Sequence, residues 1–210
     1  MAAAIEVQPV IKVAALCGSL RKASFNRGLI RSAIKISKEA INGMEIEYVD
    51  IAPLPMLNTD LEVDGTYPPA VEAFRQKILE ADSILFASPE YNYSVTGTSS
   101  SFYFLFFISS FVLCLDDTAV PSSRGCKVVR SIGINNRRGF GGGLSQYHLR
   151  QIGVYLDLHF INKPEFFLNA FQPPAKFDAE GNLIDEDAKK RIKEVILSLQ
   201  AFTRRLQAWN

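Results

Sequence analysis

The sequence predicts an α/β fold, in which a parallel, five-stranded sheet carries helices on both faces. Short apolar runs alternate along the chain with segments whose apolar residues recur every three or four positions, and this alternation is typical of parallel sheets covered by helices. The length of 210 residues suits one domain spanning residues 1–210. A hydrophobic fraction of 48% and a charged fraction of 21% are typical of a globular chain.

The first part of the chain holds two expected strands with a helix between them. Ile11–Leu16 (IKVAAL) is a short apolar run that suits a buried strand. A helical period begins at Phe25, with Ser24 as the expected N-cap and Asn42-Gly43 as the stop. The residues that carry this period are Leu29, Ile30, Ala33, Ile34, Ser37 and Ile41. Ile46–Val49 is the second expected strand.

The middle of the chain adds a loop, a helix and two strands. The residues from Asp50 to Pro69 include four prolines and are expected to form a loop. Pro69 suits the first turn of a helix, whose apolar face comprises Val71, Phe74, Ile78 and Leu79. Asp82–Ala87 (DSILFA) and Lys127–Ile134 (KVVRSIGI) are the third and fourth expected strands.

The last part of the chain is expected to be mostly helical. Leu144–Tyr155 is the first helix of this part, and Phe166–Leu168 is a short fifth strand. The acidic run Asp185–Asp187 suits a helix N-terminus, because carboxylates there face the positive end of the helix dipole. The apolar face of this final helix comprises Ile192, Val195, Ile196 and Leu199.

Three loops, which follow the first, third and fourth expected strands, hold the most unusual residues of the chain. The carboxyl ends of parallel strands lie at one edge of a sheet, where such proteins bind their ligands. We therefore expect the three loops to build one site.

The first loop, Gly18–Asn26, leads directly into a helix. It offers the hydroxyls of Ser19 and Ser24, the guanidinium of Arg21 and the free N–H groups of a helix N-terminus. Together these groups suit a phosphate monoester. The alternative is an N-capped helix with a surface arginine. The loop matches neither a P-loop nor the glycine pattern of a dinucleotide-binding turn.

The second loop, Pro89–Ser94 (PEYNYS), combines a fixed turn, two aromatic rings and amide groups. These groups suit one edge and one face of a planar heteroaromatic ring, although the hexapeptide alone also fits an ordinary polar loop. The third loop, Gly139–Gly143, has little side chain on four of its five residues, so a flat ring can approach its backbone N–H groups. The alternative for this loop is a flexible turn.

The three loops, in this order and at this spacing, resemble the NADPH-dependent FMN reductase family, and within it the soluble quinone oxidoreductases of plants. The motifs are LCGSLRKASFN, SPEYNYS and GFGGGLSQYHLRQ. Two long stretches make the resemblance specific: TDLEVDGTYPPAVEAFRQKILEADSILFASPEYN and QYHLRQIGVYLDLHFINKPEFFLNAFQPP. The resemblance covers roughly residues 10–96 and 139–206.

This resemblance implies a flavodoxin-like fold, bound FMN, and two-electron reduction of quinones or similar acceptors by NADPH or NADH. It also implies a homodimer or homotetramer. The flavin carries the redox chemistry, so no catalytic side chain is expected. Both substrates would use one face of the flavin in turn, which predicts ping-pong kinetics.

The resemblance also carries residue roles over by position. The residues that would hold the FMN phosphate and ribityl chain are Ser19, Arg21, Ser24, Phe25 and Asn26. Those that would line the isoalloxazine ring are Pro89, Glu90, Tyr91 and Asn92. Those that would lie at the other edge of the ring are Gly139, Phe140, Gly141 and Gly142.

Residues 97–138 depart from the family pattern. The family has there a helix that lies beside the flavin and forms much of the subunit interface, whereas this chain has Thr98–Leu115, TSSSFYFLFFISSFVLCL. One reading of this stretch is a transmembrane segment. Its densest apolar part, Phe102–Leu115, however, has only 14 residues, whereas a helix needs about 20 to span a membrane. The other readings are a genuine buried element and a translated intron, because T-rich DNA encodes mostly Phe, Ser, Leu, Tyr and Cys. The Thr-Gly-Gly that precedes the glycine turn in the family is also replaced, by Asn136-Arg137-Arg138.

Composition excludes several other classes of protein. A net charge of +1 gives no electrostatic case for nucleic-acid binding. Three cysteines without CxxC spacing predict neither a disulfide framework nor a zinc site and suit the reducing cytoplasm. Two histidines are too few for a His-rich metal centre. The first residues, MAAAIEVQPVIK, lack the basic and apolar regions of a secretory signal.

Two alternative functions stay open at this point. One is a flavodoxin-type electron carrier, although docking carriers generally use strong fields of one sign and this chain is nearly neutral. The other is an inactive splice or gene-model variant, for which the unusual segment is the evidence. His148, in YHLRQ, either approaches a substrate or serves on the helix surface or as a cap.

Overall fold

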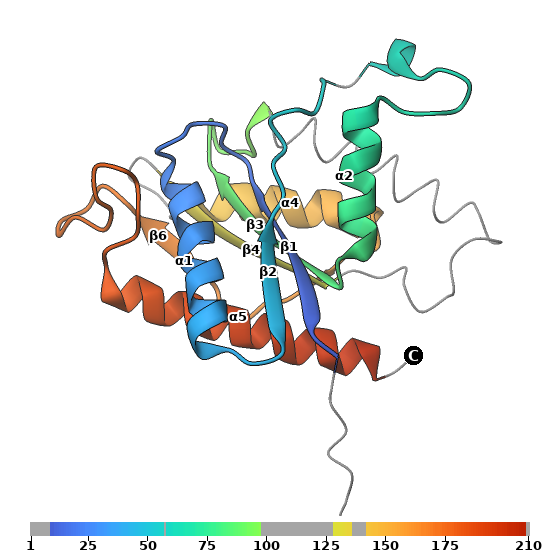
Figure 1. Ribbon diagram of the computed structural model, residues 1–210. Helices are drawn as coiled ribbons and strands as arrows, with labels where there is room; N and C mark the ends of the chain where they lie inside the picture. The colour runs from blue at the N-terminus through green and yellow to red at the C-terminus, as the bar shows by residue number, and fades with distance from the viewer. Residues whose placement is uncertain (1–8, 57, 98–127, 136–141, 209–210) are drawn as a thin grey trace, which may run out of the picture.

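The computed structural model describes residues 9–56, 58–97, 128–135 and 142–208. Within these ranges the chain forms one parallel sheet whose strands run in the order β2-β1-β3-β4-β5, with β6 also paired to β4 (Figure 1). The strands are β1 (Ile11–Cys17), β2 (Met44–Tyr48), β3 (Ser83–Pro89), β4 (Val128–Asn135), β5 (His159–Phe160) and β6 (Phe167–Asn169). This order is that of flavodoxin-like proteins, which confirms the predicted fold class.

The fifth position of the sheet differs from the prediction of five strands, because two short strands occupy it. β5 pairs with β4 at Val128-Val129, and β6 pairs with the same strand four residues further on, from Gly133 to Asn135. Pro164 lies between them, and proline has no N–H group to donate to a ladder. The fifth position is therefore interrupted, and the sheet has six strands within the described residues.

Helices cover both faces of the sheet, as predicted (Figure 1). They are α1 (Phe25–Ala40), α2 (Pro69–Glu80), α4 (Gly143–Tyr155) and α5 (Glu186–Gln207), with a short 3-10 turn, η1 (Thr59–Leu61). Alternate residues of β1 belong to two cores: Val13 to the one shared with α1 and α5, and Ala14 to the one shared with α2 and α4. This division follows from the strand itself, whose successive side chains point to opposite faces.

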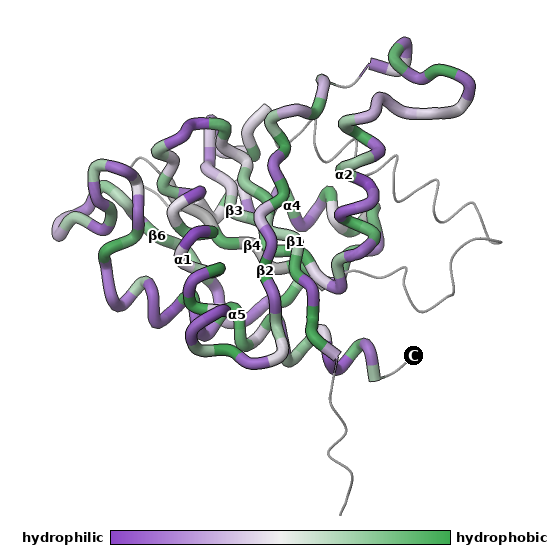
Figure 2. Tube along the Cα trace, in the orientation of Figure 1, coloured by the Kyte–Doolittle hydropathy of each residue, from purple (hydrophilic) through white to green (hydrophobic). Residues whose placement is uncertain are grey.

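The expected helix starts are confirmed. Ser24 is the residue before α1, although its side chain makes no capping hydrogen bond. Pro69 opens α2. Asp185 caps α5, accepting a 2.7 Å hydrogen bond from the backbone N–H of Ala188. Along the helices, hydrophobic and hydrophilic residues alternate (Figure 2), which matches helices that cover a sheet on one side and face water on the other.

The unusual range 97–138 includes a strand at the centre of the sheet. β4 pairs with β3 through seven residues, from Ser83 opposite Val128 to Pro89 opposite Ile134. Thr98–Leu115 and Asn136-Arg137-Arg138 lie outside the described residues. In the part of the chain that the structure describes, none of the helices is long and apolar enough to cross a bilayer.

Candidate functional site

The loop after β1 forms a tight turn that leads into α1. The Ser24 N–H donates to the carbonyl of Arg21 at 3.0 Å, and the Gly28 N–H donates to the carbonyl of Ser24 at 2.9 Å. The Arg21 guanidinium donates to the carbonyl of Ala23 at 3.0 Å and lies 6.0 Å from the centre of the Phe25 ring. The first turn of α1 has no acidic residue, so the positive end of the helix dipole faces this loop without a neutralising carboxylate.

The loop after β3 is a two-residue hairpin turn. Tyr91 and Ser94 exchange backbone hydrogen bonds of 3.0 and 2.9 Å. Between them Asn92 has a φ of 49° and Tyr93 a φ of 63°. Two consecutive positive φ values are the mark of a type I′ turn, which usually takes Asn or Gly. A tyrosine there is therefore strained.

Side-chain hydrogen bonds join this turn to its neighbours. The Thr96 hydroxyl donates to the carbonyl of Gly18 at 2.8 Å, which ties the turn to the first loop. The buried Glu90 carboxylate accepts from the backbone N–H of Leu144 at 2.9 Å and of Ser145 at 3.4 Å, at the start of α4. The turn after β3 is thus bonded to the loop after β1 and to the start of α4, which follows the third loop.

One cleft brings most of the predicted residues together. Its walls include eight of the nine positions predicted in the first two loops: Ser19, Arg21, Ser24, Phe25, Asn26, Pro89, Glu90 and Tyr91. Asn92 belongs to the turn beside the cleft and is exposed. Gly142 precedes α4 with a φ of 90°, a value that favours glycine. Gly139, Phe140 and Gly141 lie outside the described residues.

Phe171 also lines the cleft, and the sequence reasoning missed it. It follows β6 in a loop without any regular period, in the stretch AFQPP. Its ring lies 5.7 Å from that of Phe25, which stacks on Phe177 at 4.4 Å. Three aromatic rings therefore continue the wall of the cleft from α1 into the loop before α5. An aromatic residue beside a proline pair was the only signal for it.

One residue that lines the cleft, Asn26, and one buried residue close to it in sequence, Cys17, bear on what the cleft can hold. Asn26 is 4% exposed, and its side-chain oxygen has no hydrogen-bond partner among the described residues. Such a buried acceptor is costly unless a donor reaches it, and a hydroxyl-bearing ligand supplies donors. Burial raises the pKa of the Cys17 thiol, at the end of β1, so this side chain is a neutral part of the core.

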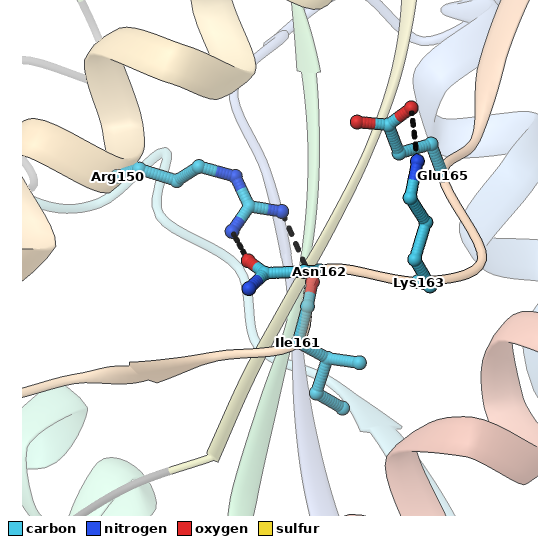
Figure 3. A network of polar contacts seen from close by, with 5 residues as sticks. All are labelled: Arg150, Ile161, Asn162, Lys163 and Glu165. Carbon is cyan, nitrogen blue, oxygen red and sulfur yellow. Dashed lines mark hydrogen bonds and ion pairs between the residues drawn. The ribbon is translucent and has the colours of Figure 1, made fainter.

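Arg150 fixes α4 to the segment that follows β5 (Figure 3). The guanidinium donates to the Asn162 side chain at 2.9 Å and to the carbonyl of Ile161 at 3.0 Å, and it lies 5.2 Å from the centre of the Phe160 ring. Burial lowers the pKa of Arg150, although arginine stays charged in proteins. The helix that receives Glu90 is thus anchored independently of the cleft.

The chemistry of this cleft suits a phosphorylated ligand with hydroxyl groups and a flat ring. Arg21, two serine hydroxyls and the N-terminus of α1 suit the phosphate. The aromatic rings and the strained turn suit the flat ring. In the described parts of the chain, no group of three or more His, Cys, Asp or Glu side chains is placed to hold a metal ion.

Comparison with known proteins agrees with a site for such a ligand. A sequence model of the NADPH-dependent FMN reductases matches residues 11–112. An NADPH:quinone oxidoreductase from Arabidopsis thaliana is 62% identical over 207 residues, which cover 99% of this chain and 99% of that protein.

Two solved structures share the fold. FerB, a flavoenzyme NAD(P)H:(acceptor) oxidoreductase from Paracoccus denitrificans, has a TM-score of 0.67 and 24% identity, and the match covers 95% of this chain and 98% of that one. A flavodoxin from Fusobacterium nucleatum bound to flavin mononucleotide has a TM-score of 0.52 and 14% identity, with 91% and 98% covered. At these identities the likeness concerns the fold alone.

Proposed function

Because the chain belongs to the NADPH-dependent FMN reductase family, we propose that it is an FMN-dependent oxidoreductase that uses NAD(P)H to reduce quinones by two electrons. The observation that carries the proposal is the cleft, in which eight residues predicted to hold FMN line one surface together with Phe171. The plant relative that is 62% identical is a quinone oxidoreductase, which supports a quinone as the acceptor.

The phosphate end of FMN would lie at the start of α1. The hydroxyls of Ser19 and Ser24 and the fork of Arg21 would donate hydrogen bonds to it, and the N-terminal amides of α1 would add their dipole. Asn26 would pair its buried side-chain oxygen with a hydroxyl of the ribityl chain. Phe25 and Phe171 would exclude water from this end.

The ring of FMN would lie between the turn after β3 and the glycine turn before α4. Pro89, Glu90, Tyr91 and Asn92 would line one side. At the other edge would lie Gly139, Phe140, Gly141 and Gly142. The Glu90 carboxylate has a second task, because its hydrogen bonds to the start of α4 fix the distance between the two turns.

FMN, when bound, would supply the redox chemistry, which is two-electron transfer from NAD(P)H to the acceptor. The task of the chain is to bind, to orient and to exclude water. An electron carrier of the flavodoxin type is not favoured, because the most similar relative reported above is an oxidoreductase and the net charge is +1. Carriers that dock on partners generally use a strong field of one sign.

A homodimer or homotetramer in the cytoplasm is part of the proposal. Large exposed side chains lie near the cleft and on α4, notably Tyr93, 75% exposed, and Val154, 79% exposed. Such side chains suit contact with a second copy of the chain. The free, buried Cys17 suits a reducing compartment. Light scattering on the purified protein measures the oligomeric state.

A visible spectrum of the purified chain after desalting tests the central claim. Flavin absorption that stays with the protein, and NADPH oxidation that depends on an added quinone, are the expected results. Because one cleft must serve both substrates, initial rates should give parallel lines in double-reciprocal plots. A desalted protein that neither retains nor rebinds FMN would overturn the proposal.

A further inference from the structure

We propose that His148 is a positioning residue of the redox site, which acts through Ser94 to hold the turn at residues 91–94 in shape. The inference rests on the proposed function, because it takes FMN as the ligand of the cleft. His148 itself is not among the residues that line the cleft. Its effect on the cofactor therefore passes through the turn.

The turn needs support because its backbone is strained. Asn92 and Tyr93 both have positive φ values, 49° and 63°. Asparagine tolerates this region, whereas tyrosine, with a bulky Cβ substituent, adopts it rarely. A conformation of this kind persists only where the surrounding structure fixes it.

Packing provides little of that support. Tyr91 is 55% exposed and Tyr93 is 75% exposed, so neither aromatic ring is buried against the body of the protein. Two backbone hydrogen bonds between Tyr91 and Ser94 close the turn, but they act within it and fix nothing to the rest of the molecule.

Helix α4 supplies the attachment at both ends of the turn. Before the turn, the Glu90 carboxylate accepts from the backbone N–H of Leu144 at 2.9 Å. At its end, the Ser94 hydroxyl and Nδ1 of His148 form a half-buried hydrogen bond of 2.8 Å. Residues 144 and 148 are four apart and so lie on the same side of the helix. The strained turn is thereby attached at two points to one rigid element.

The role depends on Nδ1 of the imidazole and so makes a specific demand on the residue at position 148. Asparagine places a polar side-chain atom near the position of Nδ1 and can keep the bond to Ser94. Leucine has a comparable bulk and no polar atom. If His148 filled space only, the two substitutions would have the same effect.

The test compares His148→Leu, His148→Asn and Ser94→Ala in the full chain. Three quantities are measured: the dissociation constant of FMN, from quenching of flavin fluorescence; the visible circular dichroism of the bound flavin; and kcat and KM for the quinone. His148→Leu and Ser94→Ala should each weaken FMN binding about 5- to 10-fold, the loss expected for one hydrogen bond. Both should also change the visible circular dichroism of the bound flavin. His148→Asn should stay within about twofold of the wild type, because it keeps that bond.

The other histidine of the chain provides a matched control. His159 lies on β5 opposite Val128, at the amino end of β4 and so away from the cleft. His159→Leu should leave the FMN affinity and the dichroism unchanged. Thermal melting of every variant shows whether the fold is intact.

Two double variants make the test specific to the turn. The double variant His148→Leu/Ser94→Ala should bind FMN no more weakly than either single variant, because both substitutions remove the same hydrogen bond. His148→Leu should also cost less in a Tyr93→Gly background, since glycine removes the strain that the bond opposes.

The inference is overturned if His148→Asn is as impaired as His148→Leu, if the two losses multiply in the double variant, or if His148→Leu binds FMN like the wild type. These outcomes are distinct from a failure of the proposed function. If the proposed function failed, the wild-type chain itself would not bind FMN.

Discussion

At the residue scale, Arg21 is the cation that we propose binds the FMN phosphate. Its guanidinium is exposed at the cleft and makes one hydrogen bond, to the carbonyl of Ala23. Arg21→Ala should weaken FMN binding by about 1.5–3 kcal/mol, the loss expected for a hydrogen bond to a charged group. Fluorescence titration measures this loss.

Riboflavin is the control ligand for Arg21, because it lacks the phosphate. Arg21→Ala should bind riboflavin as the wild type does, and Arg21→Lys, which keeps the charge but not the planar fork, should fall between the two for FMN. An equal loss for riboflavin and FMN would show that Arg21 supports the loop and not the phosphate.

Tyr48 should make the stability of the protein depend on pH in the alkaline range. Burial raises the pKa of Tyr48 to about 12 from an ordinary value of 10. The unfolded chain therefore releases this proton first as the pH rises. Stability that comes from the neutral phenol is fully present below about pH 10 and is lost as the pH approaches about 12.

The Tyr48→Phe variant isolates this effect. It keeps the ring, which lies 4.7 Å from the guanidinium of Arg27, and removes the ionisable hydroxyl. Urea unfolding at about pH 9 and about pH 11.5 should show a smaller loss of stability in the variant than in the wild type. Equal losses in the two proteins would assign the alkaline transition to other groups.

At the scale of elements, the contact between α1 and the loop before α5 leaves no room for added volume. A Cβ atom at Gly28 would overlap the carbonyl oxygen of Gly181. Gly181 itself has a φ of 77°, so its backbone cannot easily move away from the added atom. Gly28→Ala should lower the free energy of unfolding by about 1–3 kcal/mol, as overpacking does.

Gly97→Ala is the matched control for that substitution, because no atom of the described residues lies within 4 Å of the Cβ that it adds. Chemical denaturation of both variants gives the comparison. Gly28→Ala should also bind FMN more weakly, since α1 begins at the phosphate loop. If both variants are as stable as the wild type, the contact is looser than the structure shows.

The elements that sequence could predict are those whose local pattern agrees with their final environment. Pro69 opens a helix as expected, and Ile11–Cys17 is a buried strand because its residues are apolar on both sides. β5 was missed because two residues carry no period, and only pairing with β4 makes them a strand. Phe171 was missed for a related reason, because its place at the cleft depends on long-range packing against Phe25.

The candidate site shows the same division. Residue types singled out the first two loops, and the family resemblance assigned roles to their individual residues, eight of which meet in one cleft. The roles of particular atoms were not predictable. Glu90 was expected only beside a ring, yet its carboxylate also accepts hydrogen bonds from the start of α4. The hydrogen bond between Ser94 and His148 joins residues that are 54 apart in the sequence, and no local sequence pattern predicts such a pair.

At the scale of the whole molecule, we expect the segment between Gly97 and β4 to limit the activity of this particular chain. Residues 98–127 stand where the family has a helix that shields the ring, and β4 must be left intact because it pairs with β3. Exchange of 98–127 for the segment of a family member should raise soluble yield, FMN content and quinone turnover together. We expect turnover to rise at least about 100-fold, because misplacement of reacting atoms by about 1 Å can cost that much.

A surface loop from the same donor, exchanged at residues 58–67, controls for the effect of building a chimera. Absorbance gives FMN per chain, and steady-state assays with added FMN give the turnover. If the natural chain already equals the chimera in both, its own segment is a working part of the enzyme.

The loop that carries Phe171 has a consequence for the order in which the protein is made. The ribosome releases a chain from its N-terminus, and domains generally fold as units. The cleft draws on residues from Ser19 to Phe171, and α5, which follows, packs against α1. The loop at residues 18–26 and Phe25 are therefore synthesised early, but Phe171 is added only after about four fifths of the 210 residues. Cofactor loading is then an event of the finished polypeptide, and a truncated product of interrupted synthesis would leave the ribosome without a closed place for the flavin.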